Sequence, residues 1–213
     1  MSKKTVCIVG THQSGSTRIF NLVRLLFEYN GDSVHSCWNY NFMNSDEYDV
    51  IVSKVHRTED KYLSNFDVVL LPLRNIIDAG ISTQRRLPNK YIYQSCLLNI
   101  ELFNKFKDLS HMVVRYEDYS IKQIRDISNL LGIEIGIVEI VNIMRELDAM
   151  HKSKDIIKDE RKPDERYKRT LLSQSHNTSG GISNKFIYLR DNQIKYLFTY
   201  PEIVAFMEEH NYI

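Results

Sequence analysis

The stretch TVCIVGTHQSGSTRIF, residues 5–20, decides the fold of this chain. Its first half is a short β-branched apolar run that ends in Gly10, which is typical of a buried parallel strand. Apolar side chains then recur at helical spacing from Ile19 to Phe27, and YNG at 29–31 is a helix stop. A strand, a glycine loop and a helix in this order predict the opening of an α/β fold.

The glycine loop between this strand and helix resembles a phosphate-binding P-loop, GxxxxGK[ST], in all but one position. Gly10, Gly15 and Thr17 fit the pattern, but Ser16 stands where the lysine belongs. ATP binding needs that lysine to bridge the phosphates. An anion needs only the backbone amides at the helix N-terminus, a close approach at Gly15 and the two hydroxyls. The loop therefore predicts an anion site without a metal; a strand–turn–helix joint that binds nothing is the alternative.

The rest of the chain alternates between the two patterns. Strands are predicted at 49–56, 67–73 and 111–116, with 32–36 as a further candidate, and helices at 75–86, 91–107, 120–132 and 137–147. We expect a three-layer, P-loop-like α/β fold with a central parallel sheet flanked by helices, in a single domain over residues 1–213. The charged stretch 151–170 is either a solvated segment or part of a mobile cap spanning 151–185. The tail predicts one or two short packing helices.

The totals exclude several classes of protein. The formal net charge of +1 over 213 residues gives no bulk electrostatic reason to bind nucleic acid or an anionic membrane. Cys7, Cys37 and Cys96 lie far apart without metal-ligand spacing, which indicates free thiols in a reducing compartment. No apolar run is long enough for a signal peptide or a membrane span, so we expect a cytoplasmic protein.

Four further motifs accompany the loop, and their order along the chain is informative. The motifs are Lys54-Val55-His56 at a strand end, Arg74 with Ser82 eight residues later, Tyr116-Glu117-Asp118 after a later strand, and the glycine-containing SHNTSGGISNK at 175–185. Together with Gln13-Ser14-Gly15-Ser16-Thr17, they resemble the sulfotransferase family that uses 3′-phosphoadenosine 5′-phosphosulfate (PAPS). The resemblance extends from residue 5 to about residue 190, in the family's order.

The resemblance implies a set of nucleotide-binding residues. The loop would hold the 5′-phosphosulfate, Arg74 and Ser82 the 3′-phosphate, and Tyr116 the adenine, while the late glycine loop would close over the nucleotide. The cofactor-binding residues implied are Ser14, Gly15, Ser16, Thr17, Arg18, Arg74, Ser82, Tyr116, His176, Gly180, Gly181 and Lys185. PAPS would leave as adenosine 3′,5′-bisphosphate (PAP), and no metal is required.

The resemblance also implies a mechanism, in which an acceptor hydroxyl attacks sulfur in line. His56 is the candidate general base, and Lys54, two residues earlier on the strand, would face the same transferring group. Gln13 stands where many family members carry Lys or Arg to assist the leaving group, so the source of that charge is open; His12 and Arg18 are candidates. The acceptor is a hydroxyl of a carbohydrate, a phenol or a small alcohol.

Other interpretations remain open on the sequence. A P-loop kinase or NTPase would hold Mg²⁺ on Thr17 and Asp118, and a nucleotide-binding relative without activity would explain Gln13. Arg74 has a structural alternative as a surface ion pair with Asp78. Glu117 and Asp118 have another as capping acids of the helix at 120–132. Aromatic residues at Trp38, Tyr40 and Phe42 either line an acceptor pocket or belong to the core.

Overall fold

The computed structural model describes residues 3–11, 13–39, 47–56, 60–152, 169–172 and 185–213. Its centre is a five-stranded sheet in the order β2-β3-β1-β4-β5, in which every pairing is parallel. In the register of this sheet, Val6 of the central strand lies between Val52 and Val68 of its two neighbours. The strands are β1 (Lys4–Val9), β2 (Val34–Trp38), β3 (Val50–Val55), β4 (Val68–Leu73) and β5 (Met112–Arg115).

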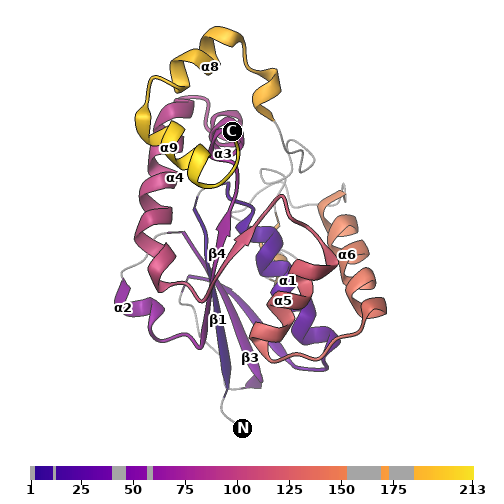
Figure 1. The fold of residues 1–213 in the computed structure, drawn as a ribbon. Coiled ribbons are helices and arrows are strands. Elements are labelled where there is room, and N and C mark those ends of the chain that lie inside the picture. Colours follow the sequence, from indigo (N-terminus) through magenta and orange to yellow (C-terminus); the bar gives the residue numbers. More distant parts are fainter. Residues whose placement is uncertain (1–2, 12, 40–46, 57–59, 153–168, 173–184) are drawn as a thin grey trace.

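Helices cover both faces of the sheet (Figure 1). The α-helices of the first half are α1 (Ser16–Tyr29), α2 (Asp60–Leu63), α3 (Ile76–Arg86) and α4 (Ile92–Phe106). Those of the second half are α5 (Ile121–Leu131), α6 (Ile137–Lys152), α8 (Asp191–Leu197) and α9 (Pro201–Glu209). The described part of the chain also contains the 3₁₀ turns η2 (Lys107–Leu109) and η4 (Lys185–Tyr188).

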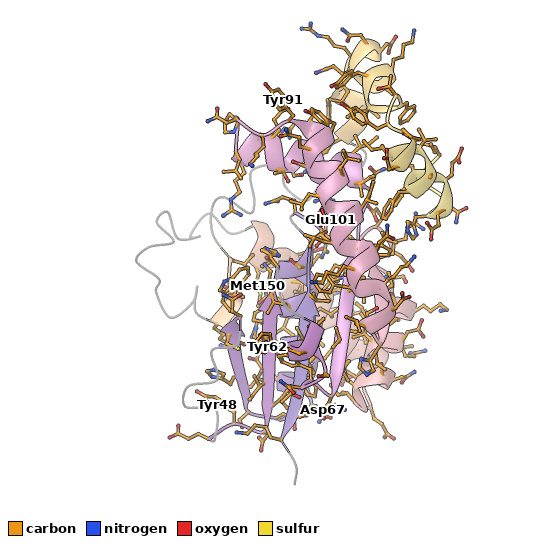
Figure 2. All side chains as sticks on the ribbon, turned by 90° about the vertical axis from the view of Figure 1, so that its left-hand side faces the viewer. Tyr48, Tyr62, Asp67, Tyr91, Glu101 and Met150 are labelled. Carbon is orange, nitrogen blue, oxygen red and sulfur yellow. The ribbon has the colours of Figure 1, made fainter. Side chains whose placement is uncertain are left out.

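Alternate residues of each central strand enter different cores. Val6 and Ile8 of β1 pack into a cluster with α1, α5 and α6, whereas Cys7 and Val9 pack into a cluster with α3, α4 and α9. Because both faces are covered, β1, β3 and β4 are apolar almost throughout rather than alternating. Figure 2 shows the second of these faces, where α4, which carries Glu101, lies over the strands.

This architecture confirms the predicted fold class: a central parallel sheet with helices on both faces. The predicted strands and helices are present with boundary shifts of a few residues. The candidate strand at 32–36 lies at 34–38, and the helix predicted at 137–147 continues to Lys152. All three cysteines are buried and free. Much of the expected cap, including His176, Gly180 and Gly181, lies outside the described residues, as do His12, Tyr40 and Phe42.

The sheet places one edge in a position to bind ligands. The strand order reverses at β1, since β2 and β3 lie on one side of it and β4 and β5 lie on the other. In open parallel sheets, ligands bind outside the carboxyl ends of the strands at such a point. Four of the predicted motifs end or follow strands at this edge: the glycine loop, Lys54-Val55-His56, Arg74 and Tyr116. Within the described residues, no helix is both long and apolar enough to cross a membrane.

Candidate functional site

The glycine loop is shaped by two glycines in crowded positions. The amide of Gly10 donates to the carbonyl of Val55 at 2.8 Å, and a Cβ atom on Gly10 would lie 2.3 Å from that of Ser16. Gly15 adopts a left-handed conformation at φ +85° and is the N-cap of α1. These constraints bring the backbone of the loop close to the first turn of the helix.

The start of α1 supplies the donors of an anion site. Ser16 and Thr17 are its first two residues. Amides in the first turn of a helix have no acceptor within the helix, so these two can donate to a ligand. The side chain of Ser14 donates to the carbonyl of Thr11 at 2.9 Å, which holds the middle of the loop. Amide groups and the positive end of the helix thus meet in one place, as the sequence predicts for a phosphate.

Lys54 approaches this loop from β3. Its side chain is 1% exposed, and its Nζ donates to the Thr17 hydroxyl at 2.5 Å. The same Nζ lies 5.1 Å from the ring centroid of Trp38, which pairs with Lys54 in the register of β2 and β3. A buried ammonium group therefore lies directly beside the hydroxyl that a P-loop enzyme uses for Mg²⁺.

His56 follows the end of β3 and is fixed in one tautomer. Its Nδ1 lies 2.8 Å from the Gly10 carbonyl oxygen, which can only accept, so Nδ1 carries the proton. The neutral ring then has its lone pair on Nε2, the form that a general base requires. Its ring contacts that of Trp38 edge-on, with centroids 4.9 Å apart. Since Trp38 is 40% exposed, Lys54 and His56 meet at an aromatic surface that is open to solvent.

Arg74 reaches the other side of the loop from the end of β4. Its Nη1 donates to the carbonyl of Gln13 at 3.0 Å, and its guanidinium lies 4.6 Å from the ring centroid of Tyr116. The side chain is 7% exposed, so Arg74 is a buried residue and not a surface one. Gln13 itself has φ +59° and offers its backbone to Arg74. Position 13 carries no charged side chain, but two positively charged side chains contact the loop from elsewhere. Lys54 contacts Thr17, and Arg74 contacts the backbone of Gln13.

Ser82 and Lys185 lie together although 103 positions separate them in the sequence. The Ser82 hydroxyl donates to the Asp78 carbonyl and accepts from Lys185 Nζ, both at 2.8 Å. Lys185 is 1% exposed, and burial together with the nearby positive charge of Arg74 lowers the pKa of Lys185 to about 8. Arg74, Ser82 and Lys185 therefore form a second group of polar side chains beside the first, and two of the three carry the positive charge that an anion would pair with.

Tyr116 contacts a member of each of the two groups. A Cβ atom on Gly15 would lie 2.1 Å from its ring, so the ring is packed directly against the loop. Arg74 lies over the same ring. The aromatic side chain therefore contacts both the glycine loop and the arginine, a position from which it can contact the part of a ligand that joins two anionic groups.

Arg18 is directed toward α6. Its guanidinium donates to Asp148 at 2.8 Å and lies 3.7 Å from the ring centroid of Tyr119. These contacts tie α1 to α6, and the nucleotide-binding role given to Arg18 remains a prediction. Glu117 also differs from expectation, because Ser120, and neither Glu117 nor Asp118, caps α5 through a bond from the Gln123 amide.

The sequence interpretation missed the partners of Glu117. Its carboxylate accepts from the Asn75 amide and from the Tyr212 hydroxyl, each at 2.9 Å. Asn75 is the N-cap of α3 and accepts from the amides of Ile77 and Asp78. A capping signal was present in the sequence, since an asparagine before an apolar helix is a common N-cap. No pattern singles out Tyr212.

Comparisons with solved structures give the same fold. The structure of mouse sulfotransferase SULT7A1 complexed with PAP aligns with a TM-score of 0.67 and 11% identity, over 93% of this chain and 84% of that one. Retinol dehydratase in complex with androsterone and inactive cofactor PAP aligns with a TM-score of 0.65 and 15% identity, over 97% and 82%. No protein-family model matches the chain, and no curated protein sequence does. This chain therefore has the sulfotransferase fold.

Proposed function

We propose that this protein is a PAPS-dependent sulfotransferase that transfers a sulfuryl group to an acceptor hydroxyl. The observation that carries the proposal is a pair of groups suited to anions, with Tyr116 in contact with a member of each. One is the glycine loop with Lys54, and the other contains Arg74, Ser82 and Lys185. PAPS has two anionic ends, a 5′-phosphosulfate and a 3′-phosphate, joined by one nucleoside, and its chemistry matches this pair.

The loop would bind the 5′ end of the donor. Amides at the start of α1 and the hydroxyls of Ser16 and Thr17 would donate to the phosphosulfate oxygens. Arg74 and Lys185 would make charge-assisted hydrogen bonds to the 3′-phosphate, and the Ser82 hydroxyl would turn from the Asp78 carbonyl to donate to it as well. PAP in the two neighbouring structures supports this assignment of ligand, while their low identity leaves the residues to be tested.

The reaction would proceed by in-line displacement. His56 Nε2 accepts the proton of the acceptor hydroxyl as its oxygen forms a bond to sulfur, and the bond from sulfur to the bridging 5′-phosphate oxygen breaks. Lys54, held beside Thr17, neutralises charge that develops on the sulfonate and bridging oxygens. Gln13 would contribute through its backbone, because its carbonyl accepts from Arg74 and so holds the guanidinium in place for the 3′-phosphate. PAP and a sulfate ester are the products.

The acceptor would bind over Trp38. This ring is the exposed aromatic surface in contact with both His56 and Lys54, and aromatic rings stack on phenols and on sugar rings alike. Retinol dehydratase is known in complex with retinol and with androsterone, which supports a small hydroxyl-bearing acceptor. A carbohydrate, a phenol and a small alcohol all remain candidates for this chain.

Calorimetry in the presence and absence of EDTA tests the proposal. We expect PAP to bind at micromolar concentration, with the same affinity with or without EDTA. We expect ATP to bind more weakly than PAP at any Mg²⁺ concentration. If PAP does not bind at high micromolar concentrations while ATP binds in a Mg²⁺-dependent manner, the protein is a P-loop kinase or NTPase instead. Trp38 is the one tryptophan of the chain, so its fluorescence provides a second readout close to His56.

A further inference from the structure

The segment that follows α9 turns back toward the end of β5. The Tyr212 amide donates to the Met207 carbonyl at 2.8 Å, and Asn211 adopts a left-handed conformation at φ +55° to make this turn. Arg115 at the end of β5 donates to the His210 carbonyl at 2.8 Å and lies 4.4 Å from the ring centroid of Tyr212. These contacts hold the Tyr212 side chain in one place beside β5.

The Tyr212 hydroxyl meets the carboxylate of Glu117 there. Glu117 Oε2 accepts from Tyr212 at 2.9 Å, while its Oε1 accepts from the Asn75 amide at 2.9 Å. One carboxylate therefore bridges the segment after α9 and the turn between β4 and α3. Hydrogen bonds to an ionised carboxylate are stronger than those between neutral groups, so this bridge restrains both partners.

The restrained turn is the one that carries Arg74, a member of the second group. The amide of Asn75 belongs to the peptide unit that joins it to Arg74, so Glu117 fixes the backbone from which the guanidinium extends. Asn75 also caps α3, the helix on which Ser82 lies. Burial and the Glu117 charge raise the pKa of Tyr212, while the charges of Arg115 and Arg74 lower it in part.

We propose that Tyr212 and Glu117 are positioning residues for the 3′-phosphate site, acting through the Asn75 backbone on Arg74. We expect neither residue to contact the nucleotide directly. Their effect is to hold Arg74 in the orientation that reaches the phosphate, so the contribution of the 3′-phosphate to affinity depends on a hydrogen bond made outside the pocket. This inference rests on the proposed function, because it concerns the same ligand.

The test measures two dissociation constants for each variant, one for PAP and one for adenosine 5′-phosphate, which lacks the 3′-phosphate. In the wild type we expect PAP to bind far more tightly. Tyr212→Phe removes only the hydroxyl, and Glu117→Gln keeps an acceptor but removes the charge. We expect each variant to weaken PAP binding by about three- to tenfold, with adenosine 5′-phosphate unchanged within about twofold. The double variant should bind PAP only slightly more weakly than either single variant, because both changes break the same bridge.

Tyr29→Phe is the control, since it removes another tyrosine hydroxyl that donates to a glutamate, Glu146 of α6, and Tyr29 lies at the end of α1 opposite to the glycine loop. This variant should leave the ratio of the two dissociation constants, for PAP and for adenosine 5′-phosphate, unchanged. If Tyr212→Phe and Glu117→Gln lower the melting temperature but keep the wild-type ratio, the bridge is only structural and this inference is wrong. If the wild type itself does not prefer PAP, the proposed function fails first, and the inference fails with it.

Discussion

Arg74→Met removes the charge assigned to the 3′-phosphate while keeping most of the apolar length of the side chain. Arg74 is 7% exposed, so solvent screens its interactions little. A hydrogen bond to a charged group contributes about 1.5–3 kcal/mol, which corresponds to about a 10- to 100-fold change in Kd. The Gln13 carbonyl also loses its 3.0 Å donor, at a cost of about 1 kcal/mol in stability. For a chain of this size that is about 2–4 °C in Tm.

The assay is calorimetric titration with PAP and with adenosine 5′-phosphate. We expect the Kd for PAP to rise by about 10- to 100-fold and the Kd for adenosine 5′-phosphate to change by less than about threefold. Arg24→Met is the control, because Arg24 is also buried, is ion-paired to Glu28 at 2.6 Å, and lies in the second half of α1, whereas the glycine loop precedes the first turn of that helix. Equal losses for both ligands would mean that Arg74 only supports the loop through Gln13, and the assignment of the 3′-phosphate site would be wrong.

Three further changes test other parts of the site. Because the pKa of Lys185 is lowered to about 8, its charge is lost as the pH rises through 8. Affinity for PAP should therefore fall between pH 7 and 9.5, whereas Lys185→Arg should remove this dependence in titrations across the same range. Gly15→Ala places a Cβ atom against Tyr116 at φ +85°, so we expect a lower Tm and weaker binding of both nucleotides. Lys54→Met removes the donor to Thr17, and we expect sulfuryl transfer to slow by about 100-fold or more with PAP affinity reduced much less; a parallel loss of both would contradict a transition-state role.

Local patterns along the sequence were sufficient for the sheet and its helices. β1, β3 and β4 are buried on both faces, so each contains a run of apolar residues, which in β3 gives way to Ser53 and Lys54 near its end. The helices α3 and α5 show amphipathic spacing with an N-cap. β2 was harder to place, because it pairs on one side only and its residues are mostly half-buried.

The site was predictable where it depends on motif spacing at strand ends, and less so where distant segments meet. Lys54, His56 and Arg74 follow strands of one parallel sheet, so their convergence follows from the fold. The Tyr212–Glu117 bond joins residues 95 positions apart, and no periodicity encodes it. The Lys185–Ser82 contact was suggested only by a family resemblance. Arg18 was placed near the loop by sequence distance, but the helical turn directs it to Asp148.

The most direct test of the central claim follows the sulfuryl group itself. Protein is incubated with PAPS labelled in sulfur, in EDTA, with a panel of phenols, sugars and small alcohols, and labelled sulfate esters are separated and counted. We predict metal-independent transfer to at least one acceptor, which His56→Ala abolishes while PAP affinity is kept. If PAP binds the wild type tightly but no label reaches any acceptor, the protein is a nucleotide-binding relative without this activity, and the mechanism built on His56 and Lys54 is wrong.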